Sequence, residues 1–186
     1  MTGADQEWQR VSAVRSPVVL AAPHVTGLRL ASGDDAPQWL SRLSVPAGWH
    51  IGRFEGLHNA PWRIAVTGHR DGSGWDGCET ISVYKFEGVI PAQALHMNAD
   101  VALRDLEAVD IEKTVFLSDD TSTAVRSVGH LAAGGVWIKA LHNYLAAEGL
   151  LIHQSIFIDA HVDAALSADI ELLCRALYTA FTARSA

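Results

Sequence analysis

The chain has 186 residues, of which 49% are hydrophobic and 19% are charged, and its formal net charge is −7. This length suits one domain, and so many apolar residues can bury a core, which excludes global disorder. The acidic balance and the lack of a Lys/Arg cluster exclude a nucleic-acid binder, because such proteins neutralise phosphates with clustered basic side chains. No stretch approaches the roughly 18 apolar residues of a membrane span.

Residues 1–40 read as an N-terminal extension, followed by a single α+β domain at 41–183. Within the extension, two short apolar stretches between residues 11 and 30 flank "APHVTG", a pattern consistent with a short hairpin. The segment "PVVLAAPHV" is interrupted by Pro23 and His24, so it matches the core of a signal peptide poorly.

Three strands and one helix are predicted next. The segments "LSVPAGWHIGRF" (43–54), "WRIAVTGH" (62–69) and "CETISVYKF" (78–86) carry apolar residues at every second position, which is typical of strands in a sheet. The segment "PAQALHMNADVALRDLEAV" (91–109) begins with a proline and has apolar residues every three or four positions. This spacing predicts an amphipathic helix.

A period of two returns in four further segments, at 112–118, 123–132, 136–146 and 150–159. Short turns separate them, which predicts an antiparallel meander. A last helix is expected to be capped by Ser167, with the apolar stripe Ile170, Leu173, Leu177 and Phe181. The expected fold class is therefore α+β, an antiparallel sheet flanked by helices in the order β-β-β-α-β-β-β-β-α.

Two histidines lie close together in the apolar run "LHNYLAAEGLLIHQ" (141–154), and the turn between the strands decides whether they meet. If Ala147 and Glu148 alone form the loop, His142 lies directly opposite His153, and the two could act as a metal or catalytic pair. With Gly149 added to the loop as a bulge, His142 lies opposite Gln154 instead.

We favour the bulge, because it collects the isoleucines of the last strand on one apolar face of the sheet. The opposite face then holds Lys139, Asn143 and His153, which become candidate binding residues. This register separates the two histidines. A metal pair is also disfavoured because zinc needs at least three protein ligands, and the neighbouring sequence supplies no others at a recognisable spacing.

The segment "GHRDGSGWDG" (68–77) is the other candidate site, but its spacing fits neither a calcium loop nor a phosphate loop. We interpret it as a turn that exposes Trp75 as a contact residue. Catalytic motifs such as G-x-S-x-G, H-E-x-x-H or paired cysteines are missing, and Cys78 and Cys174 read as free thiols. We therefore expect no enzymatic activity, no catalytic residues, no metal and no cofactor.

The order of elements resembles the PsbP-like superfamily, an α/β/α sandwich on an antiparallel sheet. Three segments carry the resemblance: "LSVPAGWHI", "ISVYKFEGVIPAQALHMNADVALRDL" and the closing run from "VGHLAAGG" to "LLCRALYTAF". In the order of its elements and the residue pattern of these segments, the chain resembles the actinobacterial LpqN family over about residues 40–183. Many members of that family are lipoproteins. The resemblance implies a binding module without enzymatic activity, and it transfers no catalytic residues.

The sequence therefore predicts a non-enzymatic binding or adaptor domain with an accessory or chaperone-like role towards a protein partner. The candidate binding residues are Trp75, Lys139, Asn143 and His153. Two alternatives stay open: a small-ligand carrier or enzyme that uses a pocket on the sheet face, and a homo-oligomeric structural protein. With neither a secretion signal nor a lipid-attachment cysteine recognised, we expect a cytoplasmic protein, and export by another route stays open.

Overall fold

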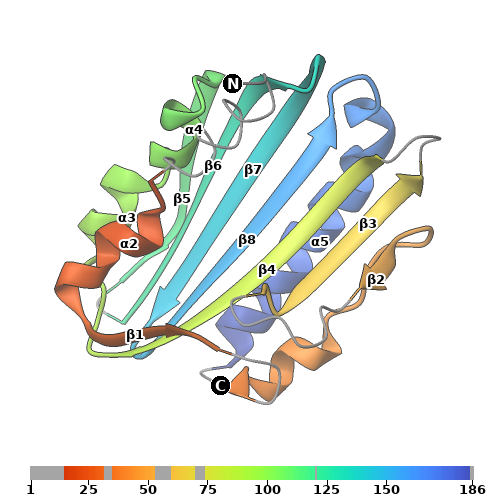
Figure 1. The fold of residues 1–186 in the computed structure, drawn as a ribbon. Helices are drawn as coiled ribbons and strands as arrows, with labels where there is room; N and C mark the ends of the chain where they lie inside the picture. Colours follow the sequence, from red (N-terminus) through yellow and green to blue (C-terminus); the bar gives the residue numbers. More distant parts are fainter. Residues whose placement is uncertain (1–14, 32–34, 53–59, 70–73, 120, 185–186) are drawn as a thin grey trace.

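The computed structural model describes residues 15–31, 35–52, 60–69, 74–119 and 121–184. A large antiparallel sheet with helices around it makes up most of this part of the chain (Figure 1). In chain order the elements are α2 (Pro17–Ala21), η1 (Ala22–His24), β1 (Thr26–Leu30), η3 (Gln38–Arg42), β2 (His50–Gly52), β3 (Arg63–His69), β4 (Trp75–Glu87), α3 (Ala92–Asn98), α4 (Val101–Asp105), β5 (Val109–Ser118), β6 (Ser122–Ala133), β7 (Val136–Ala147), β8 (Leu150–Asp159) and α5 (Asp163–Ala183).

The strands lie in the order β2-β3-β4-β8-β7-β6-β5, and β1 pairs with the second half of β4. The last four strands form the predicted meander, and β8 joins it to the long strand β4. From β2 to α5 the order of elements is the expected one, with the single predicted helix replaced by α3 and α4. The predicted fold class, an antiparallel sheet flanked by helices, is confirmed.

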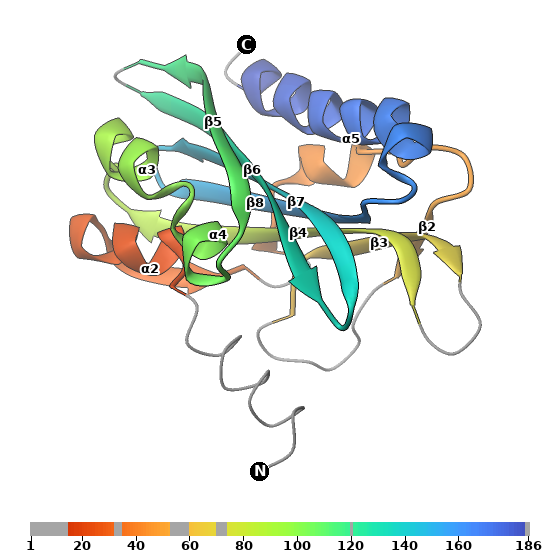
Figure 2. The same cartoon turned by 90° about the horizontal axis from the view of Figure 1, so that it is seen from above.

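Helices lie on both faces of the sheet (Figure 2). Helix α5 contacts β7 and β8 on one face, which we call the α5 face. Helices α3 and α4 contact β6 on the opposite face, the α3 face, where α2 packs beside α3. Each face has its own apolar core, with Ile81, Ile152, Leu177 and Phe181 on the α5 face and Leu95, Ala99, Tyr144 and Leu151 on the α3 face.

The helix predicted over 91–109 is wrong in extent, because the chain forms two shorter helices there and then turns. Glu107 and Asp110 both have positive φ angles, of 57° and 52°, which no helix accommodates. Val109 already belongs to β5 and is 47% exposed. Its apolar character extended the helical stripe in the sequence, although the side chain is not part of the core.

Residues 15–30 form α2, η1 and β1 in place of the hairpin considered for this segment. Residues 11–14 of that hairpin lie outside the described residues, as do residues 70–73 of the Gly-rich turn. Helix α5 begins at Asp163, ahead of the predicted cap Ser167, whose hydroxyl donates to the carbonyl of Ala164. The predicted apolar stripe of this helix is confirmed, since all four of its side chains are buried.

The hairpin between β7 and β8 has a register that neither predicted alternative contained. Ala147 pairs with Leu150, so the connection is a two-residue turn, and its Gly149 has a φ of 69°. The predicted bulge is therefore wrong. The bulge would suit strands with one buried and one solvated face, whereas helices lie on both faces and β7 is buried from Ala140 to Ala147.

Candidate functional site

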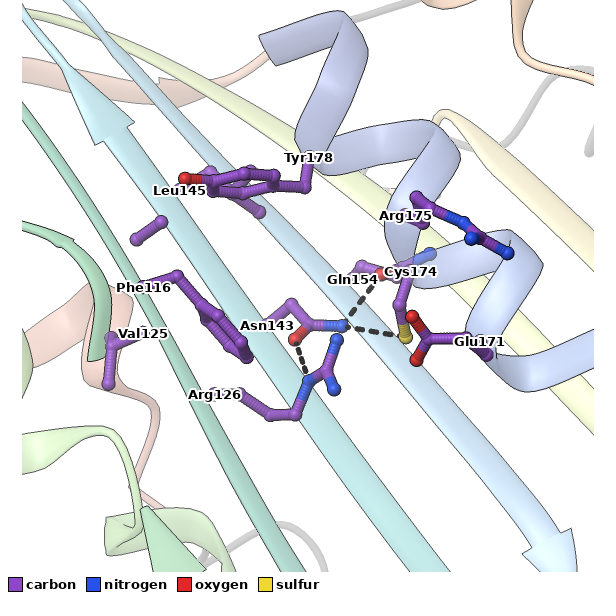
Figure 3. A pocket seen from close by; sticks show the side chains of 11 residues that line it. Phe116, Val125, Arg126, Asn143, Leu145, Gln154, Glu171, Cys174, Arg175 and Tyr178 are labelled. Carbon is purple, nitrogen blue, oxygen red and sulfur yellow. Dashed lines mark hydrogen bonds between the residues drawn. The ribbon is translucent and has the colours of Figure 1, made fainter. Parts of the chain in front are cut away.

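A cavity of about 250 Å³ lies between α5 and the sheet, on the α5 face (Figure 3). Strands β5 to β8 supply its floor and one wall, and α5 supplies the other wall. The lining combines aromatic, apolar, amide, thiol and charged side chains: Phe116, Ala124, Val125, Arg126, Asn143, Leu145, Gln154, Glu171, Cys174, Arg175 and Tyr178.

The floor of the cavity is a row of three polar side chains, one from each of β6, β7 and β8. The pairs Arg126↔Asn143 and Asn143↔Gln154 place these residues side by side on one face of the sheet. Arg126 Nε donates to Asn143 Oδ1 at 2.7 Å, and Asn143 Nδ2 donates to Gln154 Oε1 at 2.7 Å (Figure 3). Each amide is thereby held in one orientation by its neighbours.

This polar row continues beneath α5 and ends in a buried ion pair. Gln154 Nε2 donates to Glu79 Oε1 at 2.6 Å, and Arg63 donates to Glu79 Oε2 at 2.7 Å and to the carbonyl of Leu43 at 3.0 Å. Burial raises the pKa of Glu79, and the charge of Arg63 opposes that rise. The row from Arg126 to Arg63 crosses five neighbouring strands, and its hydrogen bonds satisfy polar groups that would be costly to bury alone.

A bulge in β5 turns an aromatic side chain into the cavity. Val115 pairs with Val125 and Leu117 pairs with Ala124, so Phe116 is the extra residue in the ladder. Its ring lies 6.0 Å from the ring of Tyr178 on α5. The guanidinium carbon of Arg126 lies 4.8 Å from the centre of the Phe116 ring, which is a cation–π contact. The bulge thus places an aromatic wall beside a fixed cation.

The thiol of Cys174 lines the cavity but is not an activated nucleophile. Asn143 Nδ2 donates to its sulfur at 3.4 Å, and burial raises its pKa. A protonated thiol at neutral pH is a poor nucleophile. Cys78 is also a free thiol, as the sequence predicted, so the two cysteines form no disulfide.

The structure separates the four candidate binding residues that we selected from the sequence. Asn143 lies in the cavity floor, and Lys139 is on the same face, where its ammonium group is 2.9 Å from Asp163. His153 lies on the α3 face, so the prediction that it shares a face with Lys139 and Asn143 is wrong. Trp75 begins β4, outside the cavity lining, and is 45% exposed.

The two histidines do meet, contrary to our expectation, because the true register makes them diagonal neighbours on the α3 face. His142 Nδ1 lies 3.1 Å from His153 Nε2. The hydroxyl of Ser155 lies 3.2 Å from the first nitrogen and 3.0 Å from the second. The ring of Tyr144 stacks on His153 with a centroid separation of 4.4 Å. The cluster therefore joins two imidazoles and a hydroxyl on the α3 face of the sheet.

Both histidines are poor bases in this setting. Burial lowers the pKa of His142 to about 4. Burial and the neighbouring His142 lower the pKa of His153 well below its ordinary value. Both rings are therefore neutral at physiological pH. Within the described ranges, no group of three or more His, Cys, Asp or Glu side chains could hold a metal ion.

Most cavity residues could not be recognised from the sequence. Arg126 lies on β6, whereas Cys174 and Tyr178 lie on α5, and only the packing of α5 against the meander brings them together. One usable signal was Gln154, a long polar residue in the middle of the apolar run "LLIHQSIFI". A buried glutamine needs partners, so its neighbours across the sheet mark the polar row.

Comparisons with known proteins bear on the fold. No protein-family model matches the sequence, and no curated protein matches it significantly. Among solved structures, the chain is similar to the crystal structure of LpqN, described as involved in cell envelope biogenesis of Mycobacterium tuberculosis. The two align with a TM-score of 0.55 and 13% sequence identity, over 78% of this chain and 86% of that one. The chain therefore has an LpqN-like fold.

This comparison contradicts our expectation of a cytoplasmic protein, because the similar structure is of a protein involved in cell envelope biogenesis. In the described part of the chain, no helix combines the length and the apolar character needed to cross a membrane.

Proposed function

We propose that this chain is a non-enzymatic binding domain associated with the cell envelope, and that it holds a protein partner at the cavity between α5 and the sheet. The observation that carries the proposal is the cavity itself, with a hydrogen-bonded polar floor and aromatic walls. The envelope location is supported by the solved structure with the same fold, which is of a protein involved in cell envelope biogenesis.

The size of the cavity favours one anchoring side chain of a protein partner over a free ligand. Pockets for drug-sized molecules usually measure about 300–1,000 Å³, and the volume of about 250 Å³ lies below that range. Protein interfaces, by contrast, obtain most of their affinity from a few side chains buried in small pockets. Phe116 lines the cavity and is 45% exposed, which gives a partner apolar surface to cover.

A small-molecule carrier is the second candidate function. It is favoured by the three polar side chains that converge on the cavity floor, because such groups orient ligands in small-molecule sites. The two functions differ in what accompanies the protein from its native cells. A carrier retains a small molecule, whereas an adaptor retains a stoichiometric protein.

We expect Tyr178→Ala to weaken the partner at least roughly thirtyfold, since truncating an aromatic side chain at a hot spot costs about 2 kcal/mol or more. The tagged protein is recovered from its native cells, the partner is identified by mass spectrometry, and its dissociation constant is measured by calorimetry. Trp75→Ala is the matched control, because Trp75 is an exposed aromatic residue outside the cavity lining.

If a partner binds the Tyr178→Ala variant as tightly as the unchanged protein, the cavity is ruled out as its binding site. Loss of the partner on Trp75→Ala alone would move the interface to the start of β4. Recovery of a bound small molecule without any protein would support the carrier and overturn the adaptor.

A further inference from the structure

We propose that the cavity recognises a carboxylate, supplied by an aspartate or glutamate side chain of the partner and bound by the guanidinium of Arg126. This inference rests on the proposed function, and it names the chemistry of the anchor. It is carried by the contacts of Arg126, by the charges around the cavity and by the order of the buried polar row.

Arg126 is held in a fixed orientation while its terminal nitrogens stay available. Its Nε donates to Asn143 Oδ1 at 2.7 Å, and its guanidinium lies against the ring of Phe116. Neither terminal nitrogen has a hydrogen-bond partner in the described residues. An arginine with one fixed nitrogen and two open ones presents a planar fork that matches the two oxygens of a carboxylate.

The remaining charges around the cavity favour an anion. Arg175 on α5 lines the opposite wall, and neither it nor Arg126 forms an ion pair within the described ranges (Figure 3). Elsewhere the arginines near carboxylates are paired, as in Arg15–Asp105, Arg29–Asp35 and Arg63–Glu79. The cavity thus carries two arginines and one glutamate, Glu171, on a chain whose formal net charge is −7.

The buried polar row explains why Arg126 points its fork at the cavity. Glu79 accepts from the amide nitrogen of Gln154, which fixes that amide, and the oxygen of Gln154 then accepts from Asn143. Asn143 is left with its oxygen towards Arg126, where it binds Nε. This order of hydrogen bonds leaves Nε as the edge of the guanidinium that is bonded inside the protein.

The inference is tested with a probe that carries one carboxylate on an aromatic stem. Phenylacetate is titrated into ¹⁵N-labelled protein and followed by NMR, with the neutral phenylacetamide as its matched comparison. We expect phenylacetate to shift the Arg126 Nε–H resonance in a saturable manner. We expect the amide to bind roughly tenfold more weakly or worse, because hydrogen bonds to charged groups are about twice as strong as neutral ones.

Three variants sharpen the test. Arg126→Gln is expected to lose roughly tenfold or more in phenylacetate affinity, while its glutamine can still donate to Asn143 and so spare the fold. Arg175→Gln changes an exposed residue of α5 and is expected to weaken binding by a smaller factor. Glu171→Gln removes the only acidic side chain in the cavity lining and is expected to strengthen binding.

Equal binding of phenylacetate and phenylacetamide would overturn the inference, and so would unchanged affinity in a folded Arg126→Gln variant. The proposed function stands or falls separately. A protein partner that is lost on Tyr178→Ala but not on Arg126→Gln would keep the adaptor and reject the carboxylate. Saturable phenylacetate binding without any protein partner would reject the partner's side chain as its source and leave a small acid as the ligand.

Discussion

Replacing Arg63 with methionine is expected to lower the free energy of unfolding by about 3–5 kcal/mol, the cost of removing one partner from a buried ion pair. The change removes the guanidinium that lies 2.7 Å from Glu79, in a site where neither side chain is more than 4% exposed. Glu79 is then left as a buried carboxylate whose remaining partner is the amide of Gln154. Urea unfolding at pH 7, followed by circular dichroism, measures the loss.

The double variant Arg63→Met/Glu79→Met separates charge from packing. Because it removes both charges and fills similar volume, it is expected to recover most of the stability that Arg63→Met loses. A double variant as unstable as the single one would show that the hydrogen bond from Arg63 to the carbonyl of Leu43 matters more than the charge. A loss below about 1 kcal/mol for Arg63→Met would contradict the assignment of a buried, uncompensated carboxylate.

The histidine cluster on the α3 face is expected to destabilise the protein as the pH falls from 7 to 5. The pKa of His142 is lowered by burial from 6.5 to about 4, so between these values the unfolded chain binds a proton that the folded chain excludes. The contribution is fully present above about pH 6.5 and is lost progressively towards pH 4. At pH 5 the loss relative to pH 7 amounts to about 2 kcal/mol for this one residue. The lowered pKa of His153 adds to the loss in the same direction.

The comparison is made between the unchanged protein and His142→Gln/His153→Gln, from urea unfolding at pH 7 and pH 5. The double variant is expected to lose clearly less stability over this interval. Hydrogen bonds from arginine side chains lower the pKa of Asp35 and Asp105 to about 2, so those groups act below pH 4 and outside the interval. The raised pKa of Glu79 acts in the opposite direction, but equally in both proteins. Parallel pH profiles would rule out the neutral, buried pair.

These two experiments address opposite faces of the same strands. On the α5 face, polar side chains are held in a row that ends at an open cavity. On the α3 face, burial lowers the pKa of both histidines, so their rings are neutral at physiological pH. If the proposals hold, variants of the histidine cluster change stability with little effect on phenylacetate binding, whereas Arg126→Gln does the reverse.

Local periodicity was sufficient to predict most elements of the fold. The apolar alternation of "WRIAVTGH" and "CETISVYKF" corresponds to β3 and β4, and the stripe from Ile170 to Phe181 is the buried face of α5. The same reasoning failed at 91–109, where the break between α3 and α4 and the turn into β5 leave the apolar spacing intact. Periodicity reports which side chains face a core, and it does not register where a backbone turns.

The candidate site was largely beyond prediction, because it depends on one register and one packing arrangement. A shift of one residue between β7 and β8 exchanges the faces of a strand, and apolar residues on both faces give no preference between registers. The class of fold, the meander and the buried stripe of the last helix were predictable from the chain alone, since they follow from the local hydrophobic pattern. The contacts of Asn143 with Arg126 and Gln154 under α5, and of His142 with His153, became visible in the folded protein alone, because long-range strand pairing sets them.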